Sequence, residues 1–370
     1  EEIKGTFSQM GYSFPLNLKK GEVKINRPQT PLPPFPYQTK DVSFENKGID
    51  PQTGKPSAAG GAKLAGTLTL PEGFKKGMPV VIMVTGSGQQ NRDEELMGHK
   101  PFLVIADWLA RHGIASLRYD DREVGKSTGD AAKATTYDNM LDALAGIDFL
   151  KTTKEFGKIG VLGHSEGGTI GYMLAARGKA DFVVSLAGPA LRGDSILLMQ
   201  NRDILKKAGL DEENINNYAE ALRRIFQYKV SGNKLRFASK PEALLPMLTS
   251  DINLPEQLRQ NLLETIKQLD GEWLNYFISY DPAADLRQTK CPVMLLGGDC
   301  DTQVRAKENI SAAKSLLPKN AKNLFKEYPN VNHIFQPSTN GMPLEYGRIE
   351  TTIQEDVLKD IATWIQSVAK

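Results

Sequence analysis

KIGVLGHSEGGTIGYMLAARG, residues 158–178, is the stretch from which the fold can be worked out. Its opening apolar run, residues 159–162, predicts a short buried strand. A Gly-His-Ser-Glu-Gly turn follows, and residues 169–177 are typical of a helix that stops at Gly178. A strand, a sharp turn and a helix with Ser165 at the apex form the arrangement called a nucleophile elbow.

The glycines on either side of Ser165 agree with this interpretation. At a turn this tight, side chains at Gly163 and Gly167 would collide with the adjoining strand and helix. The Ser165 hydroxyl is then held clear of the sheet for attack, and the Glu166 amide can face an oxyanion. A G-x-S-x-G string also arises by chance as an ordinary Gly-rich turn. Because a strand precedes it and a helix follows it, we predict that Ser165 is a catalytic nucleophile.

Composition limits the possible functions. The 370 residues are 40% hydrophobic and 24% charged, with a net charge of +2, enough for one large α/β domain plus an insertion. The near-neutral charge and the lack of a basic run with interleaved aromatics argue against a nucleic-acid partner. No apolar stretch approaches the ~20 residues of a membrane span. The two cysteines, Cys291 and Cys300, flank a predicted strand and are expected to lie too far apart for a disulfide.

The N-terminal part differs from the rest of the chain. Residues 5–7 and 23–25 predict one or two strands, and RPQTPLPPFPY (27–37) predicts a stiff extended linker rather than a ligand for another protein. We therefore expect residues 1–36 to be a β-strand remnant plus linker, and residues 37–370 to be one catalytic domain. The chain starts at Glu1 without Met or a signal segment, so we expect a leader or a longer N-terminal part to be missing.

From residue 41 onward, strand and helix patterns alternate. Residues 42–44 and 64–70 predict a hairpin pair, and the apolar run at 79–84 is typical of a central parallel strand. Further strands are expected at 114–118, 182–187, 292–297 and 323–328. Helices are expected at 101–112, 136–150 and 305–317, the second with Thr135 and Asp138 as a capping pair, and a last helix with a Thr352–Glu355 capping box. This alternation predicts an α/β fold with a mostly parallel, doubly wound sheet.

The alternation is interrupted by about a hundred residues with helical patterns only. We expect these residues, about 190–285, to form a helical lid inserted between late strands and placed over the strands' C-terminal edge. Met199, Phe226, Trp273 and Phe277 are expected to form the lid's own core rather than pocket walls.

A serine needs a base to take its proton, and the base needs a third group to orient it. The chain has four histidines. His164 adjoins the nucleophile and is expected to pack, while His99 and His112 are expected to be structural or solvated. His333 lies in a loop just past the last predicted strand, and loops at that edge converge on the elbow. We therefore predict that His333 is the base.

The acid is expected in the loop after the strand at 292–297, where Asp299 and Asp301 are both candidates. Asp301 is favoured, because Asp299 lies in the tight turn that leaves the strand and is suited to bonding local backbone. The order Ser165, Asp301, His333 is that of α/β-hydrolases, not of chymotrypsin or subtilisin. Serine at the elbow disfavours the carboxylate nucleophile that epoxide hydrolases and dehalogenases use.

An oxyanion hole needs two backbone donors. We predict the amides of Glu166 and of Ser87, which lies in the Thr-Gly-Ser-Gly loop after the strand at 79–84. The same loop lacks the Lys-Ser/Thr that would complete a phosphate-binding P-loop. No cluster has metal-site spacing, so neither a metal nor another cofactor is expected.

Several ordered motifs resemble bacterial α/β-hydrolase esterases of the serine-aminopeptidase-like group. They are TGSGQQNRDEE, GHKPFLVIADWLARHGIASLRYDDREVGKSTGD, IGVLGHSEGG, YDPAADL, CPVMLLGGDCDTQV and NVNHIF, between residues 85 and 335. The resemblance, which runs from about Arg27 to the C-terminus, implies the triad Ser165, Asp301 and His333. It also implies an N-terminal β domain, of which residues 1–27 are the tail, and a periplasmic or secreted location, the cytoplasm being the alternative. Two departures are Thr85, where relatives often have His, and Glu123, where they usually have Gly.

The leading hypothesis is a carboxylic ester hydrolase that acts on a small-molecule ester through an acyl-enzyme. A peptidase or aminopeptidase with the same machinery is the alternative, and it needs an acidic anchor for the substrate amine. Glu166 and the acidic residues 93–95 are candidates for that anchor. A binding protein on an inactive scaffold is the third hypothesis, which an intact Ser-Asp-His set disfavours.

Overall fold

A computed structural model describes residues 2–9, 12–19, 26–231 and 241–370. Its main sheet has eight strands in the order β10-β9-β8-β7-β5-β6-β4-β3. The strands are β3 (Gln38–Asn46), β4 (Ala62–Leu70), β5 (Val80–Val84), β6 (Ala115–Tyr119), β7 (Ile159–His164), β8 (Val183–Leu186), β9 (Val293–Gly298) and β10 (Leu324–Tyr328). β3 pairs antiparallel with β4, and β4 with β6, while the strands from β6 to β10 run parallel. The predicted hairpin pair and mostly parallel sheet are confirmed.

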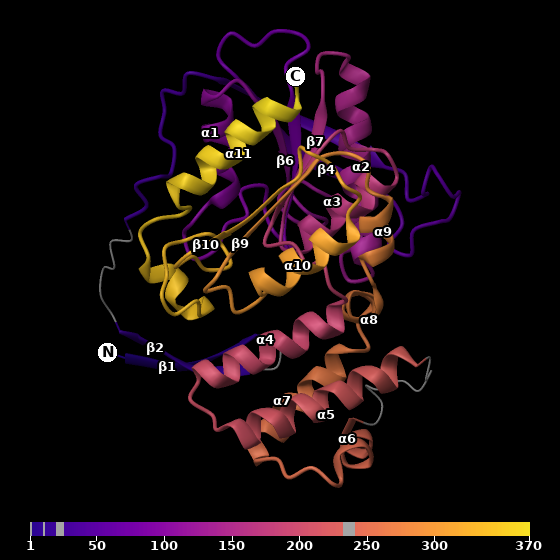
Figure 1. Ribbon diagram of the computed structural model, residues 1–370, viewed down its shortest axis with the longest axis vertical. Coiled ribbons are helices and arrows are strands. Elements are labelled where there is room, and N and C mark those ends of the chain that lie inside the picture. Colours follow the sequence, from indigo (N-terminus) through magenta and orange to yellow (C-terminus); the bar gives the residue numbers. More distant parts are fainter. Residues whose placement is uncertain (1, 10–11, 20–25, 232–240) are drawn as a thin grey trace.

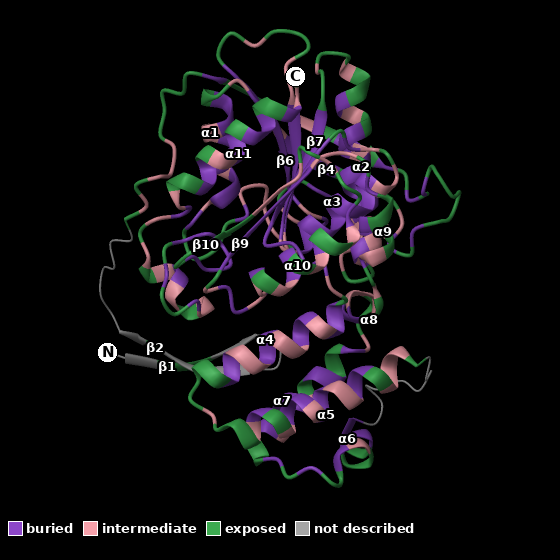
Figure 2. Ribbon diagram, viewed as in Figure 1, coloured by how far each residue is buried: buried purple, intermediate pink, exposed green. Residues whose placement is uncertain are grey.

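Helices cover both faces of this sheet (Figure 1). α1 (Pro101–Arg111) and α11 (Glu355–Val368) pack on one face, and α2 (Thr136–Thr153), α3 (Glu166–Ala176) and α10 (Ala306–Leu316) on the other. Because side chains alternate along a strand, Val80 and Ile82 enter one apolar layer, whereas Val81 and Met83 enter the other. Figure 2 shows the strands buried throughout the centre. Burial on both faces explains why the central strands are continuous apolar runs.

Between β8 and β9 the chain forms a helical insertion, which occupies the lower part of Figure 1. Its helices are α4 (Gly193–Lys207), α5 (Glu212–Val230), α6 (Pro241–Thr249), α7 (Glu256–Gln268) and α8 (Glu272–Ser279), and α9 (Ala283–Gln288) leads back to the sheet. The insertion has an apolar core of its own, built around residues such as Tyr218, Leu222 and Leu262. In the parts of the chain that the structure describes, no helix combines the length and apolar character that crossing a bilayer requires.

The N-terminal strands β1 (Glu2–Gln9) and β2 (Tyr12–Lys19) form a separate antiparallel hairpin. The strand predicted at 23–25 lies outside the described residues. The following segment is attached to the C-terminal part of the chain by hydrogen bonds. Arg27 donates to the carbonyl oxygens of Met97, Gly347 and Ile349 at 2.9–3.0 Å. Gln29 makes three hydrogen bonds of 2.7–2.9 Å with the backbone of residues 352–353.

One of the two predicted capping boxes is present. Thr135 and Asp138 form the box that begins α2, as expected. The box predicted at Thr352 is wrong, because α11 begins at Glu355 with Gln354 as its N-cap residue. The Thr352 hydroxyl instead pairs with Nδ1 of the fully buried His99 at 2.9 Å. A buried imidazole needs a partner for each ring nitrogen, which explains why the hydroxyl is used there.

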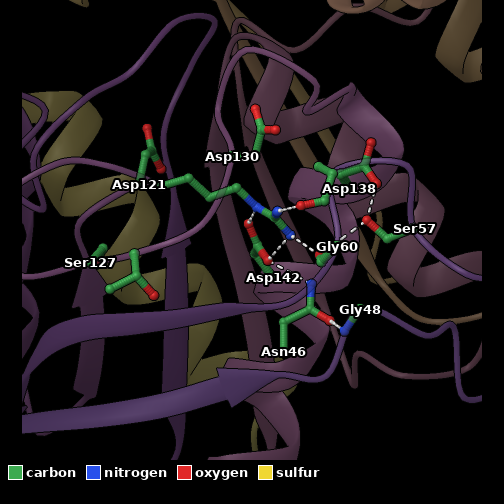
Figure 3. A network of polar contacts seen from close by, with 12 residues as sticks. Asn46, Gly48, Ser57, Gly60, Asp121, Ser127, Asp130, Asp138 and Asp142 are labelled. Atoms are coloured by element: carbon green, nitrogen blue, oxygen red, sulfur yellow. Dashed lines mark hydrogen bonds and ion pairs between the residues drawn. The ribbon is translucent and has the colours of Figure 1, made fainter.

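A buried arginine holds together the loop between β3 and β4, the turn after β6, and helix α2 (Figure 3). Arg122 donates to both carboxylate oxygens of Asp142 at 2.7 and 2.9 Å, and to the carbonyl oxygens of Ala59 and Gly60. Asn46 donates to the same Asp142 carboxylate at 2.6 Å. This network fixes three segments that lie at one end of the sheet.

Candidate active site

Ser165 occupies the sharp turn between β7 and α3, as the sequence predicts. Its backbone has φ 52° and ψ −122°, a strained conformation for a residue with a side chain. A Cβ atom on Gly163 would lie 2.0 Å from the carbonyl oxygen of Gly167. A Cβ atom on Gly167 would lie 2.1 Å from the carbonyl oxygen of Val84. Both positions therefore require glycine for the steric reason given above.

The candidate base and acid come from the ends of β10 and β9. Nδ1 of His333 lies 2.7 Å from Oδ2 of Asp301, and both side chains are buried. The other oxygen of Asp301 accepts the amides of Gln303 and Val304 at 2.8 and 2.9 Å. Because an ionised carboxylate only accepts, His333 carries its proton on Nδ1, which leaves Nε2 as an acceptor. Asp299 is exposed, and it accepts the amide of Asn330 at 2.7 Å.

Ser165 and His333 line a cavity of about 510 Å³. Ser87 and Gly86 contribute to its wall from the loop after β5, and the helical insertion covers it from the other side. Its largely apolar wall includes Leu96, Met97, Ile196, Leu197, Trp273, Phe277, Val304, Ile334 and Tyr346. Such a wall is suited to the acyl or alcohol part of an uncharged substrate.

The loop after β5 approaches the nucleophile closely. A Cβ atom on Gly86 would be 3.2 Å from the Cβ of Ser165. The Gly86 amide itself is occupied, because it donates to Oε1 of Glu94 at 2.9 Å. The next amide of the loop belongs to Ser87, whose residue lines the cavity beside Ser165. This geometry agrees with Ser87 as an oxyanion donor together with Glu166, the first residue of α3.

The segment that contains Ser165, Asp301 and His333 matches a known protein family. Residues 100–336, more than half of the chain, match the family described as serine aminopeptidase, S33. The chain belongs to this family. It is also 26% identical over 364 residues to esterase EstD of Thermotoga maritima, a match that covers 96% of this chain and 79% of that protein.

Solved structures show the fold that this S33-family chain shares. The esterase Pf2001 of Pyrococcus furiosus aligns with a TM-score of 0.51 and 16% identity, over 95% of this chain and all of that one. A putative dipeptidyl aminopeptidase IV of Bacteroides ovatus aligns with a TM-score of 0.50 and 13% identity, over 90% of this chain and 36% of that one. The predicted α/β-hydrolase fold is confirmed.

The two departures from the resemblance have local explanations. Glu123, where relatives usually have Gly, adopts φ 63°, so this S33-family chain keeps a glycine-like turn despite the side chain. Thr85 donates its hydroxyl to the carboxyl group of Asp121, with oxygen–oxygen distances of 3.0 and 3.1 Å. Asp121 also accepts the amide of Gln90 at 2.9 Å, so it supports both ends of the loop that carries Ser87.

Sequence reasoning missed two aromatic residues of the cavity. Trp273 and Phe277 of α8 stack with ring centroids 5.4 Å apart and line the cavity, whereas Phe226 lies in the core of the insertion as expected. The Trp273 indole N–H points at both carboxylate oxygens of the buried Glu166, at 3.0 and 2.9 Å. Burial raises the pKa of Glu166. An aromatic pair four residues apart was the only sequence signal, and it is equally typical of a helix core.

His164 was expected only to pack, and it does more. Its ring is buried, with Nδ1 2.9 Å from Oε1 of Glu94 and Nε2 3.0 Å from the backbone oxygen of His333. These partners lie 70 and 169 residues away in the chain, so no local pattern indicates them.

Proposed function

We propose that this protein is a carboxylic ester hydrolase that works through an acyl-enzyme on Ser165. The observation that carries the proposal is the cavity shared by an elbow serine and His333, whose Nδ1 is bonded to the buried Asp301. The names of two relatives, esterase EstD and esterase Pf2001, support an ester as the substrate class.

In this mechanism, Nε2 of His333 takes the proton of Ser165 as the hydroxyl oxygen attacks the ester carbonyl. The amides of Ser87 and Glu166 hold the oxyanion of the tetrahedral intermediate. When the intermediate collapses, His333 returns the proton to the leaving alcohol. Water then attacks the acyl-enzyme with His333 again as base, and the acid is released. Asp301 maintains the imidazole tautomer and stabilises the imidazolium throughout.

The rest of the chain has proposed roles in this function. The helical insertion, about residues 190–285, acts as a lid that shapes the cavity, within a catalytic domain at 37–370. Residues 1–36 are the tail of an N-terminal β domain and its linker, and the protein is periplasmic or secreted. The family resemblance supports these last two points.

A peptidase is the competing activity, and it requires a carboxylate free to bind the substrate amine. Most of the candidates are already engaged. Asp93 pairs with Arg118, Glu94 with His164, and Glu166 with Trp273. Glu95 is exposed at the cavity, with its carboxylate 3.6 Å from the Lys100 ammonium group. Each of these four carboxylates already has a polar partner, Glu95 with Lys100 and Asn91, so none is free for a substrate amine and ester hydrolysis is favoured.

The test is a chain-length series of p-nitrophenyl esters assayed beside aminoacyl-anilides. Ester turnover should exceed anilide turnover, and Ser165→Ala and His333→Ala should each lower kcat drastically without unfolding the protein. In another serine hydrolase such losses are on the order of 10⁶, because the triad acts as a unit. A fluorophosphonate should label the wild type but not Ser165→Ala. Faster anilide than ester turnover would favour the peptidase, and absence of labelling would indicate an inactive scaffold.

A further inference from the structure

A chain of hydrogen bonds below the cavity connects the oxyanion loop with the base. Oε1 of Glu94 accepts the Gly86 amide at 2.9 Å and lies 2.9 Å from Nδ1 of His164. On the other side of the ring, Nε2 of His164 lies 3.0 Å from the carbonyl oxygen of His333. The buried Glu94–His164 pair therefore contacts the backbone of Gly86, next to Ser87, and the backbone of His333.

The acceptors around the ring indicate its charge. The carbonyl oxygen of His333 can only accept, so Nε2 of His164 carries a proton. Oε1 of Glu94 accepts the Gly86 amide and also faces Nδ1, so a proton on Nδ1 is favoured as well. Burial alone lowers the pKa of His164, but the adjacent Glu94 charge and hydrogen bond and the His333 carbonyl outweigh it and raise that pKa. Asp301 also favours the charged ring, and the His333 ring centroid lies 4.8 Å away.

Packing alone does not account for this pair. Breaking a buried ion pair is destabilising, but well-packed apolar side chains of similar volume often stabilise a protein equally well. Glu94 in addition has φ 53°, a conformation that is costly for a residue with a side chain. Such costs concentrate at functional sites, where a defined geometry is required.

We propose that Glu94 and His164 are positioning residues that hold the Ser87 amide and the His333 ring in the geometry of the transition state. Neither residue takes or gives a proton in the reaction. Displacing the pair moves the oxyanion donor and the base relative to Ser165, and an error of about 1 Å can cost 100-fold in rate. The inference rests on the proposed ester hydrolysis and adds a requirement for it.

Glu94→Gln tests the proposal, because it keeps the shape of the side chain and removes its charge. The expected result is a fall in kcat of about 100-fold with KM changed less than about twofold. Affinity for a boronic acid that forms a tetrahedral adduct on Ser165 should fall in parallel. Affinity for the amide isostere of the ester, which binds without an adduct, should stay constant. Glu220→Gln, which removes ion pairs with Arg223 and Arg224 in α5, is the matched control and should change none of these values.

Further variants make the outcome decisive. His164→Phe should resemble Glu94→Gln, and the double variant should lose no more than the worse single variant, because the two residues act as a unit. If Glu94→Gln does not fold, Glu94→Asp, which keeps the charge but shortens its reach, should show the same split between kcat and KM. The positioning role would be overturned if a folded variant kept its kcat, or if it lost affinity equally for the boronic acid and for the amide isostere. In either case the wild type would still be labelled by the fluorophosphonate, so the proposed function would stand. Absence of that labelling would overturn the proposed function and this inference with it.

Discussion

Asp299 and Asp301 are separated by one residue, yet their carboxylates have different environments. Asp301 is buried, accepts two loop amides with one oxygen and meets the His333 imidazole with the other. Asp299 is exposed and closes a turn by accepting the Asn330 amide. At the scale of single residues, the nearby hydrogen-bond donors thus decide that Asp301 pairs with the base and that Asp299 bonds the backbone.

Asp301→Asn should therefore lower kcat by roughly 10⁴-fold, the loss that inverting this hydrogen bond causes in a serine protease. Asp299→Asn should leave kcat nearly unchanged and cost about 1 kcal/mol of stability at most, because one turn hydrogen bond is weakened. The measurement is kcat for both variants after circular dichroism confirms that each is folded. A crippled Asp299→Asn beside an active Asp301→Asn would reverse the assignment of the acid.

Asp121 should make stability depend on pH. Burial raises the pKa of this carboxyl to about 8, with nearby negative charges adding to the effect. In the unfolded state Asp121 has an ordinary aspartate pKa near 4. Between about pH 4 and pH 8, the folded protein therefore holds a proton that the unfolded protein has released. The contribution of the Asp121 proton to the free energy of unfolding is complete below about pH 4. It is lost as the pH rises through 8, by at most about 1.4 kcal/mol per pH unit. Asp121→Asn should be less sensitive to pH than the wild type in urea unfolding between pH 5 and 9; equal slopes would contradict this.

At the scale of elements, a side-chain hydrogen bond links the elbow helix with the helical insertion. The Glu166 carboxylate at the start of α3 accepts the indole N–H of Trp273 in α8, and Trp273 stacks on Phe277 against the cavity. The residue that follows the nucleophile thereby orients the aromatic wall of the cavity.

Trp273→Phe keeps an aromatic ring and removes the indole N–H, so it should loosen this wall. A net hydrogen bond is worth about 0.5–1.5 kcal/mol, which corresponds to roughly 2- to 10-fold in affinity. We expect KM for p-nitrophenyl hexanoate to rise by about that factor while KM for the acetate, too short to reach the wall, changes little. Phe226→Leu, in the core of the insertion away from the cavity wall, is the control. Equal effects on both esters would contradict a role in substrate selection.

The structural features that could be predicted from the sequence are those that depend on local residue patterns. The elbow, the central strands and the Thr135–Asp138 box follow from periodicity and turn chemistry over a few residues. The placement of His333 and Ser87 beside Ser165 followed from the rule that loops at one edge of a parallel sheet converge. Contacts between distant segments, such as Glu166 with Trp273, have no periodic signal, so sequence reasoning missed them. The Thr352 box failed for the same reason, since a distant imidazole takes the hydroxyl.

At the scale of the whole molecule, the Arg122 network joins segments from three parts of the catalytic domain (Figure 3). Its ion pair with Asp142 is almost completely buried, and further hydrogen bonds satisfy both partners. Such a pair is costly to break from one side, because the remaining charge stays buried without a partner.

Arg122→Met should therefore destabilise the protein by about 3–5 kcal/mol. Replacing both partners, Arg122→Met with Asp142→Leu, should recover part of that loss, because no charge is then left unpaired. Urea unfolding of the two variants gives the comparison. If the double variant is less stable than Arg122→Met, the main contribution of the network is its hydrogen bonds to the loop, not the charge pair.

The hydrogen bonds of Arg27 and Gln29 have a consequence for how the protein is made. They join an early segment to residues 347–353, more than 300 positions later, beside Tyr346 and Met97 of the cavity wall. During synthesis, Ser165 leaves the ribosome long before these partners exist, and His333 also comes from this last part of the chain. Ser165 therefore has neither its base nor a complete cavity wall until residues 333–353 have been synthesised. We therefore expect hydrolase activity only after residues 333–353 have been synthesised and have joined Arg27 and Gln29.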